Sequence, residues 1–313
     1  MRYLPAGAQH IGARQYQQDS FGFADSADQT FLGHAGFLAV LCDGMGGMAH
    51  GDVASQTAVA TILEAYRQKT PEETIPQALE RSVRQANDQV YQKAQSLGLA
   101  EGIGTTVVAA VLHQESLYFL TVGDSGLFLI HDGLLQMVNR PHVYANYLAR
   151  AVEMGMISQE IADRHPEREA LTSFVGIEKL TELDQNTEPW PVRKGDTLLL
   201  ASDGMFKTLE ADEIVTCLKG EPQKWPDLLV ECVLAKQRTG QDNVTVMTVT
   251  LADESAPPSV FTQPPVTSEA KNSDNVPKSG ASKKWLWAVL LVLVLIATGA
   301  YVGLAMRPPR PLP

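Results

Sequence analysis

The spacing of apolar residues predicts several helices. Across 76–97 apolar residues recur every three or four positions, which is typical of an amphipathic helix, and 52–68 carries a similar pattern. Shorter helices are predicted at 211–218 and 225–237. Two early helices, and two more before the last apolar run, indicate that helices cover a sheet on more than one side.

Short apolar runs bounded by turn residues predict strands. They lie at 37–42, 105–112, 116–122, 127–130, 134–138, 197–200 and 244–249. Asp132-Gly133 separates two of these runs and predicts a hairpin turn. Together with the helices, the runs favour an α/β arrangement with mainly antiparallel sheets, and periodicity alone takes the fold no further.

Aspartates stand where three of the predicted strands end or begin. Asp43 follows the first run, Asp203 follows the run at 197–200, and Asp242 opens the last run. Strand ends hold side chains rigidly, and the glycines that follow Asp43 and Asp203 let backbone carbonyls approach a ligand. Carboxylates from three distant segments suit hard cations such as Mg²⁺ or Mn²⁺. The pattern predicts a two-metal hydrolase.

Composition narrows the class of protein. The chain has 313 residues, 44% of them hydrophobic, which is enough for one large domain or two ordinary ones. A formal net charge of −11 argues against a nucleic-acid partner held by phosphate contacts. The three cysteines, Cys42, Cys217 and Cys232, have no CxxC spacing. We therefore expect small buried thiols, no disulfide framework and a reducing compartment.

The end of the chain has a different composition. Residues 253–282 are rich in Pro, Ser, Thr, Asn and Lys, which predicts a flexible linker after a catalytic domain at 1–252. Residues 285–306 contain no charge, and as a helix at about 1.5 Å per residue they would span roughly 33 Å. This predicts a transmembrane helix, followed by a short polar tail at 307–313.

The orientation of this span follows from the start of the chain. Met1-Arg2-Tyr3-Leu4-Pro5 lacks the basic-then-apolar pattern of a signal peptide. A large domain without such a sequence is hard to translocate. We therefore expect a single-pass protein of the cell (inner) membrane whose catalytic domain faces the cytoplasm. Gly299 and Gly303 leave open whether the span also dimerises.

Six short motifs resemble those of a known family and occur in its order. They are Gly12-Ala13-Arg14 with Asp19-Ser20, Asp43-Gly44-Met45-Gly46-Gly47 with Gly51 and Ala54-Ser55, Gly104-Thr105-Thr106, Val122-Gly123-Asp124-Ser125, Ser202-Asp203-Gly204, and Asp242-Asn243-Val244-Thr245. Over residues 7–250 the chain resembles the metal-dependent protein serine/threonine phosphatases of type 2C, especially the bacterial members. The resemblance implies a four-layer αββα sandwich of two mainly antiparallel sheets flanked by helices, with metals at one edge.

The resemblance also implies a metal-binding role for several residues. Asp43 would bridge two metals, and the Gly44 carbonyl would ligate one of them. Asp203 and Asp242 would complete the shell of the other metal. Asp124 would help to hold a third, weaker ion. The ions would be Mn²⁺ or Mg²⁺, and the sequence does not choose between them.

Three further residues match positions near the metals. Arg14 matches an arginine that grips the substrate phosphate, and a guanidinium fork suits phosphate oxygens. Asp19 matches a carboxylate close to the site, and Asn243 is expected to orient Asp242 rather than to bind a metal. Two cations about 3.5–4 Å apart can activate a water molecule and stabilise both oxygens of an in-line displacement.

The chain departs from the family pattern in three places. Relatives usually carry Asn-Glu where this chain has Gln17-Gln18, so we expect the neutral Gln18 to weaken one metal. Asn139-Arg140-Pro141-His142 lacks an aspartate found in relatives, a departure that concerns the local loop and not the metal core. Met48 stands where many bacterial relatives have histidine, and His50 is expected to be a surface or helix-start residue rather than a proton donor.

Residues 144–175 match the variable flap of the family. Within it, 157–161 predicts a short helix with Ser158 as its N-cap.

The predicted activity is hydrolysis of phosphoserine and phosphothreonine in proteins, reversing a bacterial serine/threonine kinase. A pseudophosphatase that acts as a membrane-tethered phosphoprotein scaffold is the alternative, with Gln18 as the residue in its favour. A second alternative is a phosphatase of the same family that acts on one specific regulatory partner. A nucleic-acid or nucleotide phosphohydrolase is disfavoured by the acidity and by the absence of a P-loop sequence.

Overall fold

The computed structural model describes four stretches of the chain, residues 2–25, 27–46, 50–99 and 102–252. No helix in these stretches is long and apolar enough to cross a membrane. Three predicted segments lie outside them: the linker at 253–282, the membrane span at 285–306 and the tail at 307–313.

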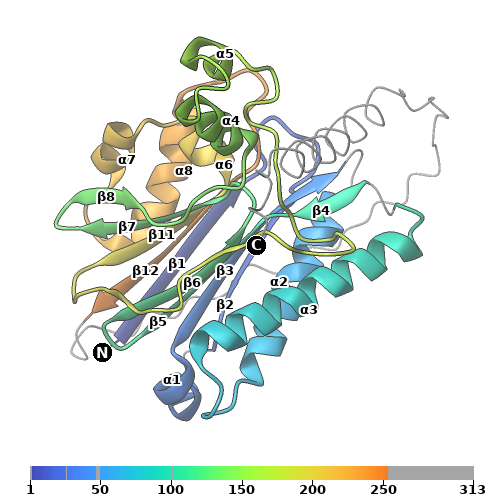
Figure 1. The fold of residues 1–313 in the computed structure, drawn as a ribbon. Coiled ribbons are helices and arrows are strands. Elements are labelled where there is room, and N and C mark those ends of the chain that lie inside the picture. Colours follow the sequence, from blue (N-terminus) through green and yellow to red (C-terminus); the bar gives the residue numbers. More distant parts are fainter. Residues whose placement is uncertain (1, 26, 47–49, 100–101, 253–313) are drawn as a thin grey trace, which may run out of the picture. The chain divides into compact units, whose positions relative to one another are not determined.

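The strands form two sheets (Figure 1). Sheet I has the order β1 (Arg2–His10), β12 (Val244–Ala252), β11 (Thr197–Ala201), β7 (Gly126–His131) and β8 (Leu134–Met137). Sheet II has the order β10 (Trp190–Pro191), β6 (Ser116–Val122), β5 (Val107–His113), β3 (Phe37–Gly46) and β2 (Asp19–Phe23), with β4 (Ile103–Thr105) on β3 and β9 (Asp184–Gln185) on β6. All of these strand pairs are antiparallel, as predicted.

Alternating side chains hold the two sheets together. In β11, Leu198 and Leu200 belong to the apolar cluster between the sheets, whereas Leu199 and Ala201 belong to the cluster on the outer face of sheet I. This is the two-residue period of a strand that is buried on both faces. The central strands therefore read as continuous apolar runs in the sequence.

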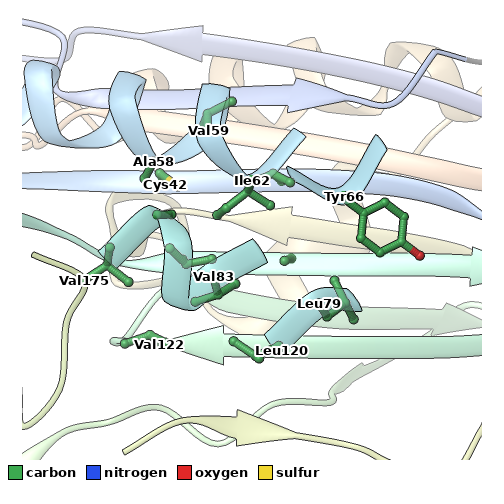
Figure 2. Close-up of a cluster of buried hydrophobic side chains, with 14 of the residues drawn as sticks. Cys42, Ala58, Val59, Ile62, Tyr66, Leu79, Val83, Leu120, Val122 and Val175 are labelled. Atoms are coloured by element: carbon green, nitrogen blue, oxygen red, sulfur yellow. The ribbon is translucent and has the colours of Figure 1, made fainter. Parts of the chain in front are cut away.

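Helices cover both outer faces, which confirms the four-layer αββα sandwich (Figure 1). Sheet II is covered by α2 (Gly51–Arg67) and α3 (Ile75–Ser96), and sheet I by α6 (Asp203–Phe206), α7 (Ala211–Cys217) and α8 (Trp225–Ala235). Figure 2 shows Ile62 of α2 and Leu79 and Val83 of α3 in one cluster with Leu120 and Val122 of β6. The remaining helices are α1 (Gln29–Ala35), α4 (Tyr144–Glu153), α5 (Gln159–Asp163) and the 3₁₀ turn η1 (Pro222–Lys224).

Local signals set the element ends. Thr74 and Gln77 form a capping box before α3, in which each side chain accepts a hydrogen bond from the other residue's backbone N–H. Asp132 and Gly133 both have positive φ, 48° and 76°, and join β7 to β8. This is the backbone that a tight hairpin with an Asp-Gly turn requires, as predicted. Ser158 caps α5 as predicted.

The cysteines differ from the prediction. Cys217 at the end of α7 and Cys232 in α8 form a disulfide, and their sequence separation is 15. The expectation of three unpaired thiols is therefore wrong for this pair, because the packing of α7 beside α8 brings together two residues that no short motif links. Cys42 is free and buried in the core, as predicted.

Candidate active site

Five aspartates gather at the edge where the two sheets meet. Asp19 begins β2 and lies opposite Asp43 of β3. Asp203 directly follows Ser202 at the end of β11, Asp242 precedes β12, and Asp124 lies in the turn from β6 to β7, where the chain passes between the sheets. The structure thus brings together all the carboxylates that the sequence singled out, from five separate segments.

Asp43 lies at the centre of this negative charge. Burial raises the pKa of Asp43 well above its usual range, and the charges of Asp19, Asp203, Asp124 and Asp242 raise it further. Four carboxylates that all act on one buried carboxyl group are costly without positive charge nearby. The cluster therefore favours a bound cation.

Two threonines fix the backbone of Asp43. The Asp43 N–H donates to Oγ1 of Thr106 at 3.0 Å, and Oγ1 of Thr105 donates to the Asp43 carbonyl at 2.9 Å. The Thr106 N–H donates to the same carbonyl at 2.9 Å. These bonds leave the position of Asp43 little freedom.

Gly44 allows three backbone segments to meet beside Asp43. A Cβ at this position would lie 2.1 Å from the carbonyl oxygen of Gly51 and 2.5 Å from that of Gln18. The Gly44 N–H donates to the Gln18 carbonyl at 3.1 Å. Any side chain here would push β3 away from the start of α2, so a glycine is required for this approach.

Asp19 connects the sheets but is only partly satisfied. Its Oδ2 accepts a hydrogen bond from Ser202 at 2.9 Å, while its buried Oδ1 has no hydrogen-bond partner in the described part of the chain. Burial raises the pKa of Asp19 to about 6, the hydroxyls of Thr245 and Ser202 offset part of this rise, and the charges of Asp203 and Asp242 add to it. An unpartnered buried carboxylate oxygen beside other acids fits a role close to a cation.

A lysine that the sequence analysis missed lies between two of the acids. Nζ of Lys207 is 2.7 Å from Oδ2 of Asp203 and 3.0 Å from Oδ2 of Asp124. Asp203 and Lys207 are four residues apart, a spacing that places them on one helix face and could have revealed the pair. Asp124, the residue expected to help hold a third metal ion, thus has the Lys207 ammonium group as a partner.

Asp242 is also paired with a cationic side chain. Nη2 of Arg14 donates to Oδ2 of Asp242 at 2.7 Å, and both side chains are about half exposed. The backbone N–H of Asn243 donates to Oδ1 of Asp242 at 2.8 Å. Arg14 therefore lies at the open side of the site, where it touches a candidate metal-binding carboxylate.

The Asn243 side chain holds the loop that carries Arg14. Its Oδ1 accepts from the Gln18 N–H at 2.8 Å, and its Nδ2 donates to the carbonyls of Ile11 and Tyr16 at 2.9 and 3.0 Å. The amide is thus used on backbone groups of this loop, whereas Asn243 contacts Asp242 through its backbone N–H. Gln18 lies between Asn243 and Gly44 and so belongs to the wall of the site.

Asn139 and His142 hold the turn that carries Asp124. Oδ1 of Asn139 accepts from the Leu127 N–H at 2.8 Å, and Nδ2 donates to the Ser125 carbonyl at 3.0 Å. Nδ1 of His142 accepts from the Gly123 N–H at 3.1 Å. The loop that lacks the family's aspartate is therefore anchored to the site by two buried polar residues that sequence reasoning did not identify.

His50 immediately precedes α2 and makes no side-chain capping bond there. This position agrees with a helix-start residue. Met48, the residue that replaces the family's histidine, lies outside the described stretches.

The flap begins and ends on paired backbone segments. Val143 bridges Leu171, and Thr105 exchanges backbone hydrogen bonds with Val175 at 2.8 and 2.9 Å. Between these contacts lie α4, α5 and several exposed apolar side chains, which include Met154, Met156 and Ile161. The far end of the flap is therefore attached to the same Thr105 that supports Asp43.

The donor set fits hard divalent cations. It consists of the oxygen atoms of five carboxyl groups and includes the unpartnered Oδ1 of Asp19. Among the described residues no three His, Cys, Asp or Glu side chains form a ready metal-binding group. Asp203 instead directs Oδ2 to Lys207, which leaves its Oδ1 to serve a cation. Asp242 directs Oδ2 to Arg14 and accepts the Asn243 N–H at Oδ1, so a cation would share an Asp242 oxygen with one of these donors.

Comparisons with known proteins agree with this geometry. A family model described as Protein phosphatase 2C matches residues 6–232. The serine/threonine phosphatase stp of Listeria monocytogenes is 31% identical over 239 residues, which cover 75% of this chain and 90% of that protein.

Solved structures show the same fold. The crystal structure of the Mycobacterium tuberculosis serine/threonine phosphatase PstP/Ppp superposes with a TM-score of 0.65 at 28% identity and covers 80% of this chain and 99% of that one. The catalytic domain of serine/threonine protein phosphatase PstP in complex with two manganese ions has a TM-score of 0.63 at 27% identity, with coverage of 80% and 99%.

Proposed function

Since this chain belongs to the protein phosphatase 2C family and is a protein serine/threonine phosphatase, we propose that it hydrolyses phosphoserine and phosphothreonine with two divalent cations at Asp43. The observation that carries this proposal is the convergence of four further aspartates on Asp43. Members of the family use Mn²⁺ or Mg²⁺, and one structural neighbour contains two manganese ions.

Each residue of the site would have a separate role in holding the two ions. Asp43 and the Gly44 carbonyl would hold one ion, and Asp43, Asp203 and Asp242 the other. When bound, such a pair of ions supplies activation of a water molecule and stabilisation of the attacking and leaving oxygens. Asp19, fixed by Ser202, would supply a further negative charge close to the ions.

Arg14 would bind the substrate phosphate. A guanidinium has five N–H donors, so the contact of Nη2 with Asp242 leaves donors for phosphate oxygens. The same contact would place the phosphate next to a cation ligand. Arg14 is therefore proposed to orient the phosphoryl group toward the ions.

The test is hydrolysis of a phosphothreonine peptide by the full chain, titrated with Mn²⁺. We expect Asp203→Asn to lower the turnover by on the order of 100-fold, because it removes a charged ligand from the site. Asp227→Asn is the matched control, since Asp227 is exposed in the first turn of α8. Equal turnover in both variants would contradict the assignment. A folded wild-type chain that binds the peptide without hydrolysing it would favour the scaffold alternative.

We further propose that a serine/threonine kinase of the same cell is among the substrates. Support comes from the activity itself, since phosphoproteins are the substrates of serine/threonine phosphatases. Incubation of an autophosphorylated kinase with wild type and Asp203→Asn would test it, with loss of phosphate expected for wild type alone.

The membrane anchor at 285–306 is also a proposal, supported by its uncharged apolar sequence. With residues 1–252 in the cytoplasm, protease added outside intact cells should leave the catalytic domain whole. The Cys217–Cys232 disulfide is the observation that favours the opposite orientation, because disulfides persist mainly in oxidising compartments. Digestion of the domain by external protease would support that second topology.

A further inference from the structure

The Lys207 ammonium group reaches from the surface to a buried acid of the site. Its Nζ contacts Oδ2 of Asp203 and Oδ2 of Asp124. The Lys207 side chain is 42% exposed, whereas that of Asp124 is only 10% exposed. A positive charge from the protein itself thus occupies the space beside a nearly buried carboxylate.

The backbone of Lys207 is fixed on both sides. Its N–H donates to the Asp203 carbonyl at 2.9 Å, and its own carbonyl accepts from Nη1 of Arg238 at 2.5 Å. Lys207 follows the last residue of α6 and lies one turn after Asp203. The contact is therefore set by the helix and does not depend on the freedom of a long side chain alone.

Asp124 is held in place as firmly. The Gly123–Ser125 turn is bound by His142 and Asn139, and Oγ of Ser125 lies 2.7 Å from Oγ1 of Thr106, which also contacts Asp43. These bonds fix the backbone of the turn, so Asp124 extends toward Lys207 from a well-held position.

The charges also favour this arrangement. Nζ of Lys207 lies 2.7 Å from Oδ2 of Asp203 and 3.0 Å from Oδ2 of Asp124, so one ammonium group faces two carboxylates. Without Lys207, the two carboxylates would need another cation between them.

We propose that Lys207 is a built-in cation that takes the place of a third metal ion at Asp124, so that this chain binds two divalent ions and not three. The inference rests on the proposed two-ion function. A divalent ion at Asp124 would meet the positive charge of Lys207 at close range, and Lys207 already donates to Oδ2 of Asp124. Lys207 is also a positioning residue, because it holds one oxygen of Asp203 and leaves the other to a catalytic ion.

The test counts bound Mn²⁺ per full-length chain by equilibrium dialysis and metal analysis, from micromolar to millimolar Mn²⁺. Wild type should saturate at two ions, and Lys207→Gln should gain one further, weaker ion. Lys207→Arg keeps the charge and should stay at two. Lys219→Gln, which changes an exposed lysine outside the site, is the matched control and should also stay at two.

Asp124→Asn provides a second, independent measurement. In the wild-type background it should leave two bound ions, whereas combined with Lys207→Gln it should remove the third. A fall in the ion count of the wild-type background would show that Asp124 holds an ion despite Lys207, which overturns the inference. This arm does not require the single Lys207 variant to fold.

Different outcomes would overturn the role of Lys207 and the proposed two-ion function. A wild type that binds three ions, or a Lys207→Gln chain that binds as many as an active wild type, overturns the role of Lys207 alone. A folded wild type that binds no Mn²⁺ and does not hydrolyse phosphopeptide overturns the two-ion function and the inference with it.

Discussion

Oγ of Ser202 donates a 2.9 Å hydrogen bond to Oδ2 of Asp19, and this bond ties the end of β11 in sheet I to the first residue of β2 in sheet II. The same hydroxyl accepts from the Thr245 N–H at 3.0 Å. The other Asp19 oxygen is buried and has no hydrogen-bond partner among the described residues. The junction of the two sheets therefore contains a carboxylate that is only half satisfied without a cation.

This carboxylate predicts a pH dependence for the ion-free protein. The pKa of Asp19 is raised to about 6 in the fold, so the folded state binds the proton more tightly than the unfolded chain does. Its contribution to stability is present below about pH 4 and is lost as the pH rises to about 6, a change of about 3 kcal/mol. Urea unfolding between these pH values would measure it.

Asp19→Asn is the control for that prediction, because an amide cannot ionise and should reduce the slope of the curve over the same interval. The raised pKa of Asp43 accounts for the slope that remains. Saturating Mn²⁺ should restore stability above pH 6 in wild type, since a cation offsets the ionised carboxylates. Wild type and Asp19→Asn with equal slopes would contradict the assignment of the pH dependence to Asp19.

Removal of the Arg14 guanidinium should weaken catalysis more than folding. Arg14→Gln loses the charged fork proposed to bind phosphate, and charge-assisted hydrogen bonds are worth about 1.5–3 kcal/mol, or roughly 10–100-fold in kcat/KM. Steady-state kinetics on a phosphothreonine peptide would show it. Arg67→Gln, at the exposed end of α2, should leave kcat/KM unchanged. A normal kcat/KM in Arg14→Gln would remove Arg14 from the phosphate site.

A negative charge at position 18 should strengthen metal binding. Gln18 lies in the wall of the site, where its carbonyl accepts from Gly44 and its N–H donates to Asn243. We expect Gln18→Glu to lower the Mn²⁺ concentration for half-maximal activity by up to about tenfold, or ~1.4 kcal/mol. Gln17→Glu is the control, because Gln17 instead accepts from the Asp19 N–H. Identical Mn²⁺ titrations of wild type and Gln18→Glu would refute the expectation.

The disulfide should stabilise the fold without taking part in catalysis. Cross-linking positions 15 residues apart restricts the unfolded chain and is worth up to about 3 kcal/mol. Reduction should therefore lower the melting temperature of wild type while phosphopeptide hydrolysis persists at lower temperature. The double variant Cys217→Ser/Cys232→Ser should melt like reduced wild type and show no further response to reductant. A wild-type melting temperature that reductant does not change would contradict the stabilising role.

The sequence predicted those elements whose pattern is local. The helix predicted at 76–97 is α3 at Ile75–Ser96, and the strand predicted at 116–122 is β6. By contrast, β1 has Pro5 and Gly7 in its interior, and its place is set by nine residues of pairing with β12 at the other end of the chain. Such a strand depends on its partner more than on its own propensity.

In the candidate site, too, the residues with a local sequence signal could be predicted and those that act through distant contacts could not. The aspartates could be found because each adjoins a strong apolar run. Asn139 and His142 could not, because they act on a turn 12 to 19 residues away through backbone contacts. Lys207 carried a usable signal in its spacing from Asp203, but the spacing does not reveal that Asp124 lies on the other side of the ammonium group.

The backbone pairing at both ends of the flap affects how its sequence can change between relatives. The bridge between Val143 and Leu171 closes residues 144–170 into a loop with fixed ends, and the Thr105–Val175 pair fixes the segment that follows it. Insertions or exchanges between these ends add little loop-closure entropy and need not move any aspartate of the edge. The flap residues between these ends can therefore be replaced in evolution while the aspartates of the active site stay the same.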